Sequence, residues 1–253
     1  MSGKFQNKNN NFSQNPIKND RDVCSRAENY MEKKEYRLAV KEYLVSILMD
    51  KSNVGAYKGA SKAYKNLKEY DKAIRHLKSA RKVYGFDSEI YYELGLNYLL
   101  NRDSENAMKN FKRSIKLTPE NKLAQLKLAL SHELEGEDDM AILVYKTIIE
   151  KNLTYIPAIS HLANLYLEKG EYLVAIEFYK RIVKINKDYY RAYLGIGLCF
   201  DEMGKYVNAT RYYKKYISYK PYCMTSKSLA ARIYNIYKYK LRTPEGAKLK
   251  IVT

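Results

Sequence analysis

Histidines and clustered carboxylates are the first residues to test for chemistry, and their spacing forms no catalytic pattern. No carboxylate pair, HExxH motif or Cys–His pairing has the spacing of a metal site or an activated nucleophile. We expect His132 in the core, His76 in solvent and His161 toward a groove. The acidic run Glu133–Asp139, ELEGEDD, lacks the alternating ligand order of a calcium loop and is predicted to be a solvated turn.

Cysteines and glycines likewise give no site. Cys24, Cys199 and Cys223 are odd in number and widely spaced, so we expect neither a disulfide framework nor a zinc site. Gly195 and Gly197 in LGIGLCF do not form a nucleotide-binding loop, because they lie inside a predicted helix. The sequence therefore predicts no enzyme, no cofactor and no metal.

Composition predicts a folded, basic chain. The 253 residues have a formal net charge of +18, with 46% hydrophobic and 29% charged residues, which excludes the disordered and collagen-like classes. No apolar run is long enough to span a membrane. The N-terminal segment 1–19 is polar and lacks the apolar stretch of a secretory signal. With few cysteines, this favours a cytoplasmic location.

Four columns of residues recur every 34 positions without insertion. An alanine column consists of Ala39, Ala73, Ala107, Ala141, Ala175 and Ala209. Four residues later comes a large side chain, namely Tyr43, Leu77, Phe111, Tyr145, Tyr179 and Tyr213. Nine residues before the alanines is a ring, and twelve before is a small residue. Such a period indicates six copies of one supersecondary unit.

Each copy is predicted to be a pair of antiparallel helices. In Asp87–Pro119, apolar residues recur at helical spacing on both sides of the polar turn RDSEN, and Thr118-Pro119 ends the second helix. Gly136, Gly170 and Gly204 mark the same turn in later copies. The small columns lie where helix axes approach, and the large side chains fill the space between neighbouring hairpins.

These columns resemble those of the tetratricopeptide repeat (TPR) family. The third copy matches the family signature at Tyr91, Leu94, Gly95, Tyr98, Ala107, Phe111, Ser114 and Pro119. The first copy departs from it at Val23 and Arg26, and the fourth at Gln125. The resemblance covers residues 20–223. It implies an all-α, right-handed superhelical solenoid of antiparallel helix pairs.

The predicted organisation is one solenoid with two tails. The six repeats are 20–53, 54–87, 88–121, 122–155, 156–189 and 190–223. Residues 224–242 are predicted to form a capping helix, with an apolar stripe of Leu229, Ile233, Ile236 and Tyr237. Residues 1–19 are expected to be a disordered polar tail, and residues 243–253 a flexible one.

The resemblance also implies that the first helix of each repeat lines a concave groove that binds ligands. Outward side chains there form an apolar strip of leucines, flanked by a lysine ladder in the second repeat. The predicted partner-binding residues are Lys58, Lys62, Lys65, Tyr92, Leu96, Leu126, Leu130, Asn164, Leu194 and Leu198. Alternatively, the leucines pack on neighbouring helices or a tail, and the lysines form a plain solvated face.

A carboxylate clamp known in some TPR domains is not expected here. That clamp uses Lys and Asn, then Asn, then Lys and Arg, from three successive repeats. At these positions the sequence has Cys24 and Glu28, then Gly59, then Glu89 and Glu93. Acids where bases are needed would repel a terminal carboxylate.

The leading hypothesis is a non-enzymatic scaffold, adaptor or assembly chaperone. It would bind an apolar, partly acidic protein segment, as a peptide or helix, in the groove. RNA or other nucleic-acid binding is an alternative, weakened because the positive charge is concentrated at separated places, +6 in 54–87 and +6 in 224–253. A third option is peripheral contact of the basic ends with an anionic membrane.

Overall fold

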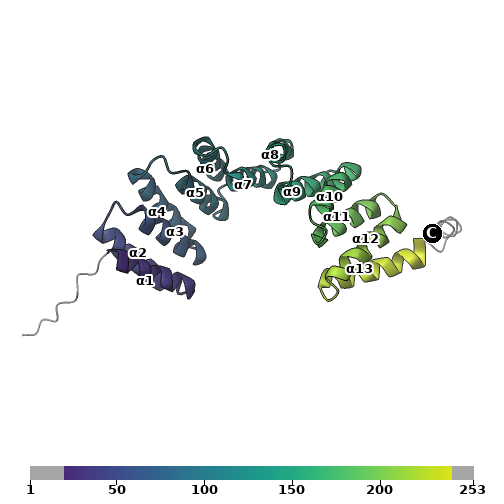
Figure 1. Ribbon diagram of the computed structural model, residues 1–253, viewed down its shortest axis with the longest axis horizontal. Helices are drawn as coiled ribbons and strands as arrows, with labels where there is room; N and C mark the ends of the chain where they lie inside the picture. Colours follow the sequence, from purple (N-terminus) through teal and green to yellow (C-terminus); the bar gives the residue numbers. More distant parts are fainter. Residues whose placement is uncertain (1–19, 241–253) are drawn as a thin grey trace, which may run out of the picture. The chain divides into compact units, whose positions relative to one another are not determined.

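The computed structural model describes residues 20–240, and in this range every regular element is helical. The all-α fold of paired helices is therefore confirmed (Figure 1). The predicted tails, 1–19 and 243–253, lie outside the described residues. No helix within 20–240 is long and apolar enough to cross a membrane.

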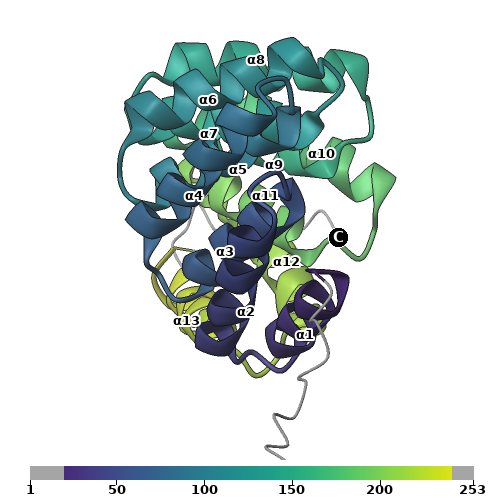
Figure 2. The same cartoon turned by 90° about the vertical axis from the view of Figure 1, so that its left-hand side faces the viewer.

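The chain divides into two compact units, Met1–Thr118 and Pro119–Thr253, a division that the repeat pattern does not predict. The first unit contains three helix pairs: α1 (Asp20–Glu32) and α2 (Tyr36–Met49), α3 (Val54–Asn66) and α4 (Tyr70–Val83), α5 (Ser88–Leu100) and α6 (Ser104–Leu117). Within a pair the two helices lie side by side, as α3 and α4 do in both views (Figures 1 and 2).

The second unit contains three more pairs and the C-terminal helices: α7 (Lys122–Leu134) and α8 (Asp138–Lys151), α9 (Ile156–Glu168) and α10 (Tyr172–Ile185), α11 (Tyr190–Glu202) and α12 (Tyr206–Tyr219), then α13 (Met224–Asn235) and a π-helix, η1 (Ile236–Lys240). Both helices of each pair begin one repeat period after their counterparts in the previous pair. We call the odd-numbered members of these pairs, α1 to α11, the inner helices, and the even-numbered members the outer helices.

The repeating columns form the core. All six alanines of the alanine column have no exposed surface, and the large side chains four residues later are all buried. The small residues on the inner helices are buried too: Ala27, Ser61, Gly95, Ala129, Ala163 and Gly197. A Cβ on Gly95 would lie 2.5 Å from the Phe111 ring, and one on Gly197 would lie 2.6 Å from the Tyr213 ring. The small and large columns are therefore the positions at which the two helices of a pair pack against each other.

The C-terminal helix is held to the sixth pair by apolar and polar contacts. Leu229 and Ile236 are buried, whereas Tyr237, predicted on the same stripe, is 44% exposed. The α-helix ends at Asn235 and the chain continues as a π-helix, so the described part of the predicted 224–242 segment is not one regular helix. The side chain of Arg232 donates two hydrogen bonds to Asp201 on α11, at 2.9 and 2.8 Å.

The turn inside each helix pair places one residue in the left-handed region of the backbone. In the second unit these are the predicted turn glycines, Gly136, Gly170 and Gly204, with φ of 74°, 77° and 70°. In the first unit the equivalent residues are Lys34, Lys68 and Arg102, with φ of 62°, 61° and 61°. A residue with a Cβ is strained at such φ values, so the first unit folds with a cost at every turn.

Replacing Lys68 with Gly is expected to stabilise the first unit by about 0.5–1 kcal/mol, because it removes the strain of about 1–2 kcal/mol and adds the smaller entropic cost of glycine. Urea unfolding followed by circular dichroism would measure this as a higher midpoint. As a matched control, Gly136→Ala should lower the midpoint, because a Cβ there meets no atom within 4 Å and only backbone conformation changes. An unchanged midpoint for Lys68→Gly would contradict the strain.

Candidate functional site

Each unit has a large cavity on its inner helices, and both cavities are built on a tyrosine that faces a glycine. The first cavity, of about 700 Å³, lies between α1, α3 and α5. It is lined by Cys24, Glu28, Met31, Glu32, Tyr43, Asn53, Gly55, Lys58, Gly59, Lys62, Glu89 and Glu93. Tyr43 reaches it from the outer helix α2. A Cβ on Gly59 would overlap the Tyr43 ring, so only glycine lets the ring lie this close to α3.

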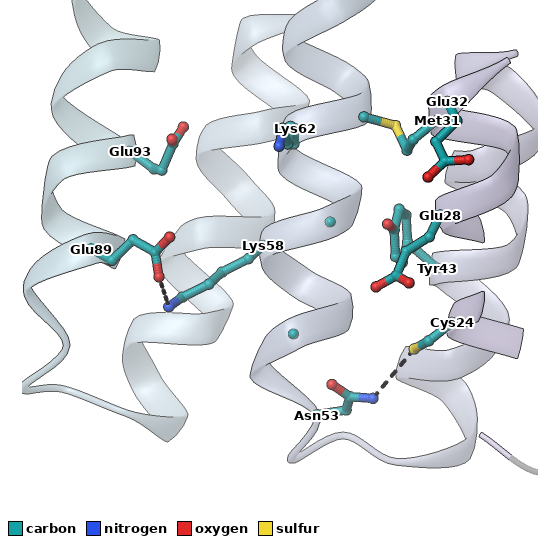
Figure 3. A pocket seen from close by; sticks show the side chains of 12 residues that line it. Cys24, Glu28, Met31, Glu32, Tyr43, Asn53, Lys58, Lys62, Glu89 and Glu93 are labelled. Atoms are coloured by element: carbon teal, nitrogen blue, oxygen red, sulfur yellow. Dashed lines mark hydrogen bonds and ion pairs between the residues drawn. The ribbon is translucent and has the colours of Figure 1, made fainter. Parts of the chain in front are cut away.

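Charged side chains from three helices face the first cavity (Figure 3). Lys58 on α3 pairs with Asp87 at 2.6 Å and with Glu89 at 2.5 Å. Burial lowers the pKa of Lys58, but its hydrogen bonds to the two carboxylates outweigh this and the pKa is raised. Asn53, the N-cap of α3, donates to the Cys24 thiol at 3.6 Å and accepts from the Ala56 amide.

The lysine ladder is therefore largely neutralised. Lys65 pairs with Glu93 at 2.7 Å, and both side chains are only about a quarter exposed. Lys62 alone of the three predicted lysines has no carboxylate within ion-pair distance among residues 20–240. The prediction of three lysines free to receive an acidic partner is corrected: Lys58 and Lys65 join the second and third helix pairs.

The second cavity, of about 590 Å³, lies on α9 and α11. Its lining includes three predicted site residues, Asn164, Leu194 and Leu198. The Tyr179 hydroxyl donates to the Asn164 side-chain oxygen at 2.6 Å, which fixes that amide at the cavity wall. Burial raises the pKa of Tyr179, so its hydroxyl remains a donor. A Cβ on Gly195 would overlap the Tyr179 ring, as at Gly59 and Tyr43.

The second cavity also combines apolar and cationic groups. Leu167 and Leu198 line it, and Leu198 is 36% exposed. Arg191, at the start of α11, is exposed and forms no ion pair with the described residues. His161 stacks on Tyr145, with ring centroids 5.6 Å apart, and burial lowers its pKa although Glu133 opposes the shift. An extended segment could thus meet apolar, amide and cationic groups together.

The rest of the predicted leucine strip is not a free surface. Leu126 is buried in the core of the second unit, 8% exposed, and Leu130 packs against the same core. Leu96 and Tyr92 are half-buried, and the Tyr92 ring lies tilted against Phe111 at 6.1 Å. Leu126 is therefore covered by its neighbours in this unit, whereas Leu194 at the same repeat position lines the second cavity. Neither Leu96 nor Tyr92 lines either of the two large cavities.

Two histidines differ in how well the sequence places them. His132 is buried, 4% exposed, as predicted, and its Nδ1 lies 2.5 Å from Glu137. The sequence predicts His76 in solvent, but it is half-buried and stacks on the Tyr64 ring at 5.3 Å. Burial lowers the pKa of His76, so the neutral ring is favoured.

The cavity glycines share a repeat position that the four sequence columns do not include. The equivalent positions, two residues before the small column, hold Ser25, Gly59, Glu93, Lys127, His161 and Gly195. At both glycines and at His161, this position faces the large tyrosine of the preceding pair. Where glycine stands opposite that tyrosine, a cavity opens. A glycine at this position, combined with a tyrosine in the large column of the preceding pair, is the sequence signal that could have predicted both cavities.

Comparisons with known proteins agree with this architecture. The model of the protein kinase G tetratricopeptide repeat matches residues 50–200, and a general tetratricopeptide repeat model matches residues 190–223. The chain belongs to the tetratricopeptide repeat family. No curated protein matches the sequence.

Solved TPR structures resemble the chain in fold, at low sequence identity. PilW, a type IV pilus biogenesis factor, is 19% identical with a TM-score of 0.69, over 83% of this chain and 98% of its own. PilF of Pseudomonas aeruginosa is 14% identical with a TM-score of 0.66, over 84% and 97%. YrrB, described as having an unusual peptide-binding site, is 15% identical with a TM-score of 0.59, over 75% and 97%.

The positions of the TPR carboxylate clamp all line the first cavity. Cys24, Glu28, Gly59, Glu89 and Glu93 are among its walls. Three of these five are carboxylates, so the cavity has the wrong charge for a terminal carboxylate. The structure thus places the acids that oppose this clamp in one cavity.

The three cysteines are free thiols in contrasting surroundings. Cys199 is buried, and burial raises its pKa to about 11. Cys223 is the N-cap of α13, where its sulfur accepts from the Ser226 amide at 3.4 Å and lies 3.3 Å from the Ser226 hydroxyl. These contacts, the side chain of Ser226 first, lower the pKa of Cys223 to about 7.

Replacing Gly59 with Ala is expected to destabilise the first unit by about 1–3 kcal/mol, because the new Cβ overlaps the Tyr43 ring and the packing must shift. Urea unfolding of the full chain would measure it. Gly85→Ala is the matched control, because its Cβ would lie 3.7 Å from the nearest atom. Equal effects of the two substitutions would show that Gly59 is not required by Tyr43.

Cys223 is expected to react with iodoacetamide with a midpoint near pH 7, because the thiolate is the nucleophile and its pKa is about 7. Mass spectrometry of the labelled peptides across a pH series would follow each cysteine. Cys199 should stay unlabelled in the folded chain, and Ser226→Ala should move the Cys223 midpoint upward. A Cys223 midpoint above about pH 8.5, that of a free cysteine, would contradict the cap geometry.

Proposed function

We propose that the chain is a non-enzymatic scaffold, adaptor or assembly chaperone that binds an apolar, partly acidic protein segment at the second cavity. TPR proteins serve in protein–protein interactions, and this general role holds for the family to which the chain belongs. The observation that supports the finer proposal is the cavity on α9 and α11. Its volume of about 590 Å³ falls in the range of known binding sites.

The lining of this cavity suggests how a segment would bind. Leu167, Leu194 and Leu198 would bury an apolar side chain, which contributes roughly 1.5–3 kcal/mol for a residue such as leucine. Arg191 would pair with an acidic side chain of the same segment, in place of the neutralised lysine ladder. Asn164, held by Tyr179, would donate its amide hydrogens to the segment's backbone carbonyls. YrrB, described as having a peptide-binding site, agrees with a peptide as the ligand.

The nucleic-acid alternative finds less support in the described residues. Stacking on bases needs exposed ring faces, but Tyr64, Tyr98 and Tyr166 have lysine ammonium groups over their rings, 5.6 to 5.8 Å from the centroids. The basic side chains are thus partly engaged by the protein's own rings. The alternative of membrane contact uses basic residues at the ends of the chain, and part of these ends lies outside the described residues 20–240. A cytoplasmic location is part of the proposal.

Replacing Leu198 with Asp is expected to reduce partner binding at least about tenfold, because it removes apolar burial and places a carboxylate in the contact. Affinity purification with the full chain from a native extract, with quantitative mass spectrometry, would measure retained proteins. Leu173→Asp on the outer helix α10, where Leu173 is 63% exposed, is the matched control. If Leu198→Asp retains the same proteins as the control, the second cavity is not the binding site.

A further inference from the structure

The first cavity is acidic although the chain is strongly basic. Its walls include four glutamates and two lysines, while the whole chain has a net charge of +18. On the α3 and α5 side, Lys58 pairs with Asp87 and Glu89. Lys65 pairs with Glu93, so both glutamates of that side are matched, and Lys62 alone of the lining lysines has no ion pair among the described residues. Negative charge without a partner is thus concentrated on the α1 side of the cavity.

Two glutamates on α1 account for this unmatched charge. Glu28 and Glu32 are exposed, and neither forms an ion pair with the described side chains. They are four residues apart, so they lie on one face of the helix and repel each other. Figure 3 shows the Glu32 carboxylate near Met31 and the Glu28 carboxylate next to the Tyr43 ring. A cation between them would remove the repulsion and add two favourable contacts.

The surroundings favour a long cationic side chain over a bare ion. Met31 and Tyr43 offer apolar and aromatic surface next to the carboxylates, which suits the methylene stem of Lys or Arg. An aromatic ring beside a cation adds a further favourable term. Lys62 on the opposite wall repels a second cation, so a single basic side chain fits best.

We propose that the first cavity binds a basic peptide segment, with one Lys or Arg side chain held between Glu28 and Glu32. Two of the three positions that hold bases in carboxylate-clamp TPR domains hold Glu89 and Glu93 here, and Glu28 stands at a further clamp position, so the cavity carries acids where that clamp carries none. The segment lies across α1 and α3, with the stem of the basic residue on Met31 and Tyr43. This site is separate from the second cavity and has the opposite charge preference.

Selection from a phage-displayed random peptide library on the immobilised full chain would test this. Peptides enriched in Lys or Arg are expected from the unaltered chain and from the control Glu150→Gln/Glu177→Gln, which changes two exposed glutamates on outer helices. Selection on the variant Glu28→Gln/Glu32→Gln should no longer enrich peptides that contain Lys or Arg. Because both sites of that variant are exposed, its circular dichroism spectrum should match the control.

Affinity measurements on one selected synthetic peptide make the test quantitative. Fluorescence anisotropy should show a weakening of about five- to tenfold for Glu28→Gln/Glu32→Gln, as for two partly exposed ion pairs. Affinity for the unaltered chain should also fall with added salt. Replacing the basic residue of the peptide by citrulline should produce a similar loss.

The proposal is overturned if the selection yields no peptides enriched in Lys or Arg, or if basic peptides bind the Glu28→Gln/Glu32→Gln variant as tightly as the control. Binding of free polyamine with the same sensitivity to these substitutions, but no basic peptide, would also overturn it. A peptide whose binding is weakened by Leu198→Asp binds at the second cavity. Failure of the proposal for one cavity therefore leaves the proposal for the other cavity standing.

Discussion

The fold depends on one packing constraint, which is that a large side chain from each outer helix must enter between inner helices. Tyr145 and Tyr213 are fully buried in this role, yet each phenol reaches far enough to donate to a carboxylate on an inner helix, Glu133 and Asp201 respectively. Burial raises the pKa of both hydroxyls, so they remain neutral donors. Because rings this large leave little space, the residues opposite them must be small, and the small columns of the sequence follow from that need.

Polar contacts between successive helix pairs follow the same period. Lys58 with Glu89, Lys169 with Asp139, and Arg232 with Asp201 each join residues about one repeat apart. Such pairs are partly exposed and contribute modestly to stability, but they decide which charges a partner can meet. A count of charge by sequence segment therefore misjudges the second repeat. Two of its lysines, Lys58 and Lys65, pair with Glu89 and Glu93 of the third repeat, which a linear count assigns elsewhere.

The repeat columns make the helix pairs and the core predictable from sequence, because the alanine, small and large columns are buried in every copy of the repeat. The site is less predictable. Leu126 and Leu194 stand at equivalent repeat positions, but Leu126 is buried whereas Leu194 is only half-buried and lines the second cavity, since the local neighbours differ. The helix pattern assigns His76 to solvent, but the Tyr64 ring covers one face. Side-chain partners on neighbouring helices decide such cases, and hydrophobic periodicity does not encode them.

The position two residues before the small column explains why cavities open where they do. In the middle repeats this position holds Glu93, Lys127 or His161, and His161 covers the ring of Tyr145. At Gly59 and Gly195 the rings of Tyr43 and Tyr179 pack directly against the helix, and each glycine–tyrosine pair lines a cavity. Glycine inside a helix costs about 1 kcal/mol relative to alanine. Two such glycines, each opposite a tyrosine, lower helix stability and lie in the walls of the two cavities. The charged residues around the two cavities differ. One repeat architecture thereby provides two cavities whose linings carry different charges.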